Sequence, residues 1–220
     1  ALVRFAQAAE RAGFDGIGLG EELSPALSTI VQPSTEIGRR SVELLVQALA
    51  GAAGGSLQPH PTDRIMRVLH RYPTAPWEWE TTTPQYELPS AAVIAEGMEW
   101  VNAPEFNRVF IAGQAGGILS QVTRAGTAGD RVAELVTEAL NTQAPAGIQR
   151  GRAVLAGSGR KLNVSLRTPV LDGVGIIHPG AMVRYVDGAA TRMGIVRSVQ
   201  VDASMPSRSQ VIGLETDAAQ

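Results

Sequence analysis

Hydrophobic and polar positions in the first third of the chain repeat mainly with the period of a helix. Residues 2–12 carry apolar side chains three and four positions apart, which predicts an amphipathic helix. A second helix is predicted to begin after a cap at Ser34 or Thr35 and to run to about residue 53. Between these helices, residues 27–31 indicate a short extended segment. This part of the chain is therefore expected to mix helix and strand.

Further along, the pattern changes to the two-residue period of strands. Residues 63–72 alternate between two sets of side chains, which predicts a strand with two differently used faces. Beyond residue 90 the predicted strands are 91–100, 107–117, 117–126, 161–171 and 210–216. A helical stretch in two pieces interrupts them near residues 130–158. Asp130 is the predicted cap of its first piece, and Pro145 stands where the second begins.

A proline-rich connector is predicted over residues 73–89, because its four prolines remove backbone donors and prevent a regular ladder. Trp77 and Trp79 lie two positions apart in this segment. If the segment is extended, both rings point to the same side and pack onto a neighbouring surface. Glu78 and Glu80 then lie together on the opposite side.

The stretch MVRYVDGAATRMGIVRSVQV, residues 182–201, predicts a β-hairpin that turns at Asp187-Gly188. The side chains expected to share a face are Val183 with Tyr185 on the first strand, and Ile195, Val199 and Val201 on the second. Arg184, Arg192 and Arg197 are then expected on the outer or rim surface. A neighbouring subunit could bind them there.

These elements predict an α+β fold. An N-terminal helix/strand portion occupies residues 1–72, the connector 73–89, and a mainly β, barrel-like domain 90–220, with helices inserted near 130–158. Closing the last strands into a barrel would remove sheet edges that otherwise invite aggregation.

Composition narrows the classes of function. The chain has 220 residues, 44% of them hydrophobic, so it can bury a substantial core. A net charge of -2 gives no basic excess for nucleic acid or an anionic membrane surface. No apolar run approaches the roughly 20 residues of a membrane span, so membrane insertion is not expected. The absence of cysteine excludes disulfides, thiolate catalysis and cysteine-ligated metals.

The candidate chemical groups do not form a recognisable catalytic or metal-binding motif. His60, His70 and His178 could belong to a metal or acid–base site, but turn and surface positions explain them better. The stretch GSGRK, residues 157–161, lacks the full spacing of a phosphate loop and is better explained as a loop before a strand. Ser28 and Ser120 have no His-Asp partners nearby in the sequence, which leaves spatial partners open. We therefore expect no catalytic residues, no cofactor and no metal.

Three stretches together resemble a known class of proteins. They are AGAAGGSLQPHPTDRIMRVLHRYPTAPWEWETTTPQYELPSA, WVNAPEFNRVFIAGQAGGILSQVTRAGTAGD and GIIHPGAMVRYVDGAATRMGIVRSVQV. In order and spacing they are similar to tail proteins of Mu-like and related siphophages and prophages, which are components of the baseplate or tail-tip hub. The similarity covers roughly residues 40–216.

This resemblance implies a non-enzymatic structural protein of the virion tail, assembled in the host bacterial cytoplasm. It implies β-barrel domains arranged in several copies around the tail axis, as a homo-oligomeric ring that also binds other tail proteins. We expect Arg184, Arg192, Arg197, Trp77 and Trp79 at the interfaces of this assembly.

Two other classes of function stay open. Residues 14–50 are also similar to the C-terminal part of LacI-type regulators, which implies a sugar-binding domain, although the helix-turn-helix and repeated βα units of such a regulator are missing. A carbohydrate-active enzyme would use Glu78 and Glu80 as a carboxylate pair beside the tryptophan rings. A solvated acidic face explains these two residues better.

Overall fold

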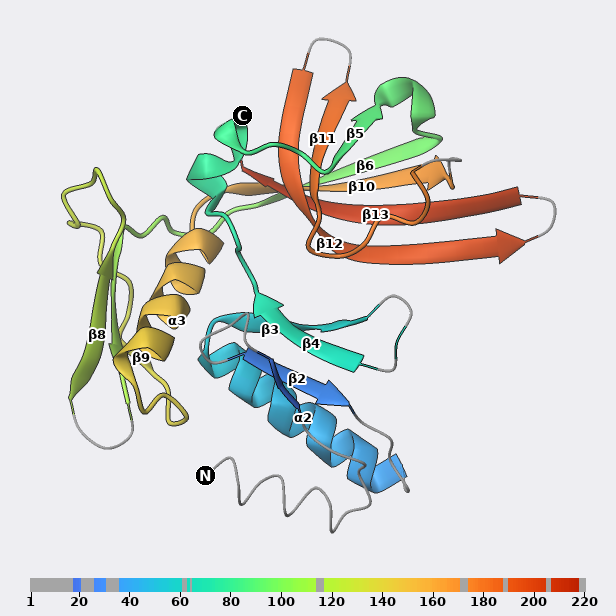
Figure 1. Ribbon diagram of the computed structural model, residues 1–220. Helices are drawn as coiled ribbons and strands as arrows, with labels where there is room; N and C mark the ends of the chain where they lie inside the picture. Colours follow the sequence, from blue (N-terminus) through green and yellow to red (C-terminus); the bar gives the residue numbers. More distant parts are fainter. Residues whose placement is uncertain are drawn as a thin grey trace. The chain divides into compact units, whose positions relative to one another are not determined.

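A computed structural model gives the fold of the chain (Figure 1). It describes residues 18–20, 26–30, 36–60, 63, 65–113, 117–170, 174–187, 190–204 and 207–217. The helix predicted at residues 2–12 lies outside this range. The chain forms two compact units, the first from Ala1–Pro73 with Phe106–Gly157 and the second from Thr74–Glu105 with Ser158–Gln220.

The first unit contains a helix packed on a small antiparallel sheet. The helix α2 spans Glu36–Ala52, and the sheet has the strand order β1-β2-β4-β3. Its strands are β1 (Gly18–Gly20), β2 (Ala26–Ile30), β3 (Gly55–Pro59) and β4 (Ile65–His70). Val42, Val46 and Ala50 are buried and lie four residues apart, so they form one stripe along α2. The second predicted helix and the strand predicted at 63–72 are confirmed.

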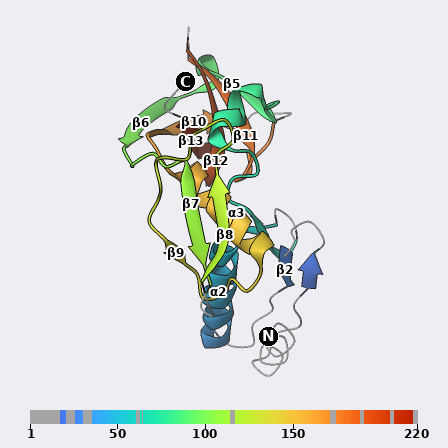
Figure 2. The same ribbon diagram turned by 90° about the vertical axis from the view of Figure 1, so that its left-hand side faces the viewer.

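A second sheet in this unit carries a helix of its own. Strand β7 (Arg108–Ala112) pairs antiparallel with β8 (Ile118–Thr123) and parallel with β9 (Val136–Thr137). The helix α3 (Ala144–Gly157) lies along β7 and β8, as Figure 2 shows. Val109, Ile111, Ala133 and Leu155 form the buried core of this layer.

The helix predicted to begin at Asp130 is wrong. Instead, Asp130 Oδ1 accepts a hydrogen bond of 2.8 Å from Asn107 Nδ2, and the backbone N–H of Arg131 donates to Asn107 Oδ1. The following residues run beside β7, where the N–H of Ala133 donates to the carbonyl of Arg108. Backbone pairing with a distant strand therefore replaces the local helical bonds. The second predicted piece is confirmed as α3, with Pro145 in its first turn.

The second unit is a six-stranded sheet with the order β5-β11-β12-β13-β10-β6. Its strands are β5 (Tyr86–Pro89), β6 (Ala95–Val101), β10 (Lys161–Pro169), β11 (Met182–Asp187), β12 (Ala190–Ser204) and β13 (Ser207–Asp217). Neighbours are antiparallel except for β5 and β11, which are parallel. Two 3-10 helices, η1 (Pro76–Thr81) and η2 (Ser90–Ala92), flank β5.

The prediction that this sheet closes into a barrel is wrong. Strands β5 and β6 form its two edges, and no described strand joins them. The sheet is nevertheless curled, since β11 and β6 are not neighbours in its strand order and yet their side chains meet. The hydroxyl of Tyr185 on β11 donates to Glu96 Oε2 on β6 at 2.8 Å. Strand β5 has only four residues and ends in Pro89, which has no N–H, so it offers little ladder for closure.

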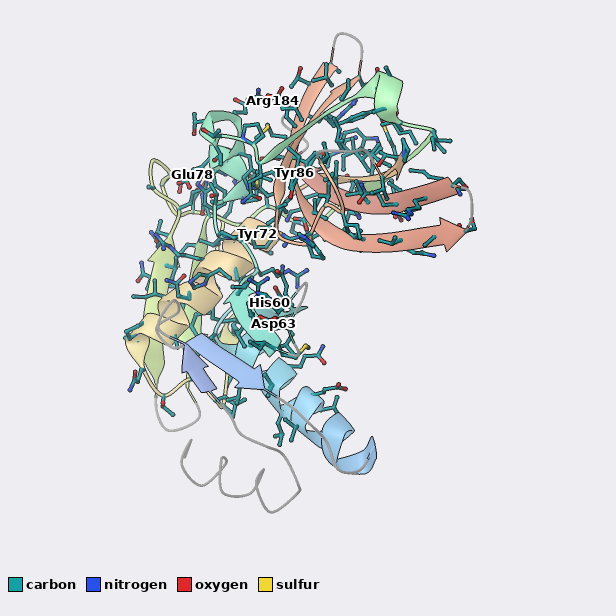
Figure 3. All side chains as sticks on the ribbon, turned by 45° about the vertical axis from the view of Figure 1, so that its right-hand side comes forward. His60, Asp63, Tyr72, Glu78, Tyr86 and Arg184 are labelled. Atoms are coloured by element: carbon teal, nitrogen blue, oxygen red, sulfur yellow. The ribbon has the colours of Figure 1, made fainter. Side chains whose placement is uncertain are left out.

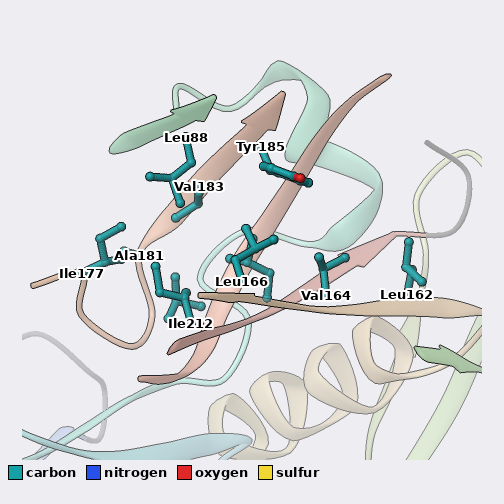
Figure 4. Close-up of a cluster of buried hydrophobic side chains, with 11 residues drawn as sticks. Leu88, Leu162, Val164, Leu166, Ile177, Ala181, Val183, Tyr185 and Ile212 are labelled. Atoms are coloured by element: carbon teal, nitrogen blue, oxygen red, sulfur yellow. The ribbon is translucent and has the colours of Figure 1, made fainter. Parts of the chain in front are cut away.

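The curl of the sheet holds the main hydrophobic core (Figure 4). Its buried side chains are Leu88, Leu162, Val164, Leu166, Ile177, Ala181, Val183, Tyr185, Val196, Ile212 and Leu214. The predicted shared face of Val183 and Tyr185 is therefore confirmed, and Leu162, Val164 and Leu166 of the predicted strand β10 line the same core. Side chains from five of the six strands meet here, so residues far apart in sequence form one core.

A bulge shifts the faces of β12. The register of its pairing with β13 changes between Val196 and Ser198, which leaves Arg197 as the extra residue. Val196 and Val199 consequently contact the same core although they are three residues apart, while Ile195 is buried outside that cluster. The prediction that Ile195 shares one side with Val199 and Val201 is wrong for this reason.

Candidate assembly surfaces

The five residues predicted to lie at interfaces all belong to the second unit. Arg184 lies on β11, where its Nη1 is 2.6 Å from Glu87 Oε1 on the adjacent edge strand β5. The side chains are 36% and 63% exposed, so this is a solvated pair. Figure 3 shows Arg184 among the labelled residues of this sheet.

Arg192 follows the turn of the same hairpin. Its Nη1 lies 3.7 Å from Asp187 Oδ2, which is longer than a hydrogen bond. Tyr185 is its register partner on β11. Arg192 is half-buried and Asp187 more exposed, so the guanidinium is held near the rim by charge rather than by a fixed hydrogen bond.

Arg197, the bulge residue, belongs to a buried ion cluster with Glu215 and Lys161. Its Nε donates to Glu215 Oε2 at 2.7 Å, and Lys161 Nζ donates to Glu215 Oε1. The side chains of Glu215 and Lys161 are almost completely buried. Burial raises the pKa of Glu215, but the hydrogen bonds and charges of Arg197 and Lys161 outweigh it and lower this pKa to about 2. The cluster therefore joins β10, β12 and β13.

The tryptophans lie in η1, so the prediction of an extended segment is wrong here. Pro76 is the first residue of this 3-10 helix, where its fixed φ and missing N–H are tolerated. Trp79 is fully buried and donates its ring N–H to the carbonyl of Thr74 at 3.0 Å. Trp77 is 36% exposed. Positions two apart in a 3-10 helix point to different sides, which separates the two rings.

Strand β6 presents a surface that the sequence analysis did not identify. All seven of its residues are exposed, including Met98 and Trp100, which are 46% and 49% exposed. Met98 pairs with Val164 and Trp100 with Leu162, so both point to the same side of the sheet as the buried core. The guanidinium of Arg160 lies 4.0 Å from the centre of the Trp100 ring. The sequence AEGMEW does not alternate between apolar and polar residues, and this was the signal from which the exposure of the strand could have been predicted.

A second open edge lies on the far part of β12. The last register pair between β11 and β12 is Met182 with Ile195. Residues Ser198–Ser204 pair with β13 alone among the described strands, and Val201 there is 43% exposed. The hairpin of β12 and β13 therefore extends beyond β11 as an arm, which Figure 1 shows.

The three histidines considered as chemical candidates are divided between the two units. In the first unit, His60 Nδ1 is 3.3 Å from Asp63 Oδ2, at an exposed turn seen in Figure 3. His70 lies on β4, where burial and then the charge of Arg152 lower its pKa. His178 belongs to the second unit. Among the described residues no group of three or more His, Asp or Glu side chains could hold a metal ion.

The other candidate sites lie in a turn and in a 3-10 helix. Residues 157–161 are the turn from α3 to β10, as expected for a loop before a strand. Glu78 and Glu80 are exposed on η1, and the carbonyl of Glu78 accepts bonds from the hydroxyls of Thr81 and Thr82. In the part of the chain that the structure describes, no helix is both long and apolar enough to cross a membrane.

The stretch that resembles a regulator does not show the regulator's arrangement in its described part. Strands β1 and β2 pair antiparallel with each other, and β2 pairs antiparallel with β4. A LacI-type sugar-binding domain is built from parallel βα units. The described strands of residues 18–70 therefore give that resemblance no structural support.

Comparison with solved structures identifies a shared fold. The crystal structure of the tail protein from Neisseria meningitidis MC58 matches 96% of this chain with a TM-score of 0.55 and 16% sequence identity. The 43 kDa tail protein of prophage MuSo2 from Shewanella oneidensis matches 81% of the chain with a TM-score of 0.48 and 17% identity. The predicted resemblance to phage tail proteins is confirmed at the level of the fold by the Neisseria protein.

The matches cover only part of the longer proteins. The chain spans 66% of the Neisseria tail protein and 54% of the Shewanella protein. No protein-family model matches the sequence. No curated protein matches it either.

Proposed function

We propose that this chain is a non-enzymatic structural subunit of a bacteriophage or prophage tail or baseplate. The observation that carries this proposal is the likeness of its fold to the Neisseria tail protein over 96% of the chain. Two open sheet edges, on β6 and on the far part of β12, are the features expected of a protein that works by association.

The subunit acts by binding copies of itself and other tail proteins. Assembly around a tail axis needs a heterologous contact, in which two different surfaces of each copy meet and close a ring. Arg184 and Trp77 are each 36% exposed, so both can contact a neighbour, whereas Arg192 is only 21% exposed and contributes mainly its charge. Acidic side chains of the next copy suit the two arginines. Arg197 and Trp79 act on the interface indirectly. Their hydrogen bonds, to Glu215 and to the carbonyl of Thr74, hold the sheet and η1 in place.

The mass of the purified chain in solution tests this function. Size-exclusion chromatography with light scattering, over a series of concentrations, should show trimers or larger species that grow with concentration. A strictly monomeric chain at high concentration would contradict the proposal. A thermal shift on adding sugars, or polysaccharide hydrolysis lost in Glu78→Gln, would favour a ligand-binding or enzymatic function instead.

A further inference from the structure

We propose that strand β6 of one copy pairs edge to edge with residues Ser198–Ser204 of β12 in a second copy, so that the sheet continues between subunits. This inference rests on the proposed function, because it names the two surfaces through which the copies associate. It is supported by an edge strand without lysine, proline or bulge, by an exposed apolar pair on that edge, by a matching edge elsewhere on the same sheet, and by charge.

The outer edge of β6 lacks several of the features that protect an edge strand. Protected edges are short, carry proline or charged side chains, lysine above all, contain a bulge or point a charge inward. The charges of β6 are Glu99 and the inward-pointing Glu96, which accepts a hydrogen bond from the hydroxyl of Tyr185. Strand β6 has seven residues, Ala95–Val101, with no lysine and no proline, and its register with β10 is uninterrupted. The opposite edge is β5, which has four residues and ends in Pro89. The sheet is therefore closed to pairing at one end and open at the other.

Met98 and Trp100 make the open edge apolar on its core side. Both point to the side of the sheet where Val164 and Leu162 are buried, yet about half of each side chain is exposed. A strand added beside β6 would cover them and extend the core of the curled sheet. Exposed apolar pairs at an open edge typically mark an interaction surface.

The far part of β12 matches this edge in length and pattern. Ser198–Ser204 has seven residues, as the register with β13 shows, and no described strand covers its other side. Val199 and Val201 lie two apart and pair with Ile212 and Gln210, so they face the core side of their sheet. Their spacing equals that of Met98 and Trp100, which allows apolar side chains of two copies to lie side by side.

Charge favours this pairing over the association of two β6 edges. Strand β6 carries Glu96 and Glu99 and no basic residue, so two β6 strands together would bring four carboxylates close. Ser198–Ser204 carries one acid, Asp202, which lies 4.0 Å from Arg167 Nη2. Arg208 pairs with Ala203 on the adjacent strand. A β6 strand beside Ser198–Ser204 brings three carboxylates together, one of them near Arg167, so this edge suits β6 better than a second β6 does. Two different edges build a ring rather than a closed pair.

Directed disulfide formation tests the pairing, because the natural chain contains no cysteine. We would mix Met98→Cys chains with Val201→Cys chains, and separately with Ala203→Cys chains, since the two strands can meet in registers two residues apart. Differently sized tags distinguish the products. The proposal expects mixed disulfide dimers to dominate in at least one mixture. Disulfide dimers of Met98→Cys alone in equal yield, or no dimers in either mixture, would overturn it.

Lysine substitutions test the same surface without cross-linking. Met98→Lys and Val201→Lys should each weaken association at least about tenfold, because each puts a charge on one of the paired edges. Ile148→Lys is the matched control, since Ile148 is 42% exposed, close to the 43% of Val201, and lies on α3 in the first unit. Melting temperatures should stay close to that of the natural chain. Association unchanged in both edge variants would contradict the proposal.

The outcomes separate this inference from the proposed function. If the natural chain associates but neither edge variant weakens it and no mixed disulfide forms, the function stands and the pairing is wrong. If the natural chain stays monomeric at every concentration and forms no mixed disulfide, both are wrong. Association lost only in the edge variants supports both.

Discussion

Glu215 holds three strands of the second unit together through one buried carboxylate. It accepts from Arg197 on β12 and Lys161 on β10. Because the carboxylate has two cationic partners, it stays ionised despite its burial, and its pKa falls to about 2. Removing a partner from such a cluster leaves charge buried without full compensation, whereas a solvated ion pair contributes little.

Acid should therefore destabilise the second unit over a defined range. The folded-state pKa of Glu215 lies below its ordinary value of 4.5, so its contribution is complete above about pH 4.5 and is lost as the pH falls toward 2. The loss is on the order of 3 kcal/mol. Urea unfolding at a series of pH values measures it. Glu215→Gln should flatten this pH dependence, and an equally steep dependence in that variant would assign it to other groups.

Arg197 and Arg184, which lie on the same sheet, should differ in their contribution to the free energy of unfolding. Arg197→Ala removes a hydrogen-bonded partner of a buried carboxylate and should lower the free energy of unfolding by about 2–3 kcal/mol. Arg184→Ala removes one member of an exposed pair and should lower it by less than about 1 kcal/mol. Denaturant unfolding of both variants provides the comparison. Equal losses would show that burial of the cluster is not what stabilises the sheet.

Helices and strands with a regular period were predictable, and those shaped by distant contacts were not. Helix α2 repeats its apolar positions every four residues, and β10 alternates cleanly, so local pattern sufficed for both. Residues 130–137 have a helical pattern but pair with β7, which the local sequence does not reveal. The exposed edge of β6 depends on the strand order of the whole sheet. The bulge at Arg197 likewise depends on pairing with β13.

The end of α2 shows how closely two elements approach. Gly54 follows the helix with φ +69°, and a Cβ there would lie 2.6 Å from the carbonyl oxygen of Gln149 on α3. Gly126 has a similar φ of +74°, but a Cβ there would meet nothing within 4 Å. The two glycines therefore share backbone strain and differ in packing.

Alanine at these two positions separates strain from packing. Gly126→Ala should cost about 1 kcal/mol, because only the left-handed backbone is penalised. Gly54→Ala should cost about 1–3 kcal/mol more, since α2 and α3 must also move apart. Chemical denaturation of the two variants measures the difference. Equal losses would mean that the two helices can part without penalty.

At the scale of the whole molecule, the chain passes between its two units three times, near residues 73, 105 and 157. The core of the second unit accordingly joins Leu88 to segments beyond residue 158, and no local pattern encodes that connection. The resulting sheet is curled but open, with two edges that share an apolar pattern and differ in their number of acidic residues. The proposed pairing would complete this open sheet with another copy of the chain.

Electron microscopy of the purified chain tests the central claim most directly. The account predicts closed rings of several copies, in which β6 of each subunit lies beside the β12 arm of the next. Single particles of one copy at every concentration would contradict it, and so would two-fold pairs joined through identical edges.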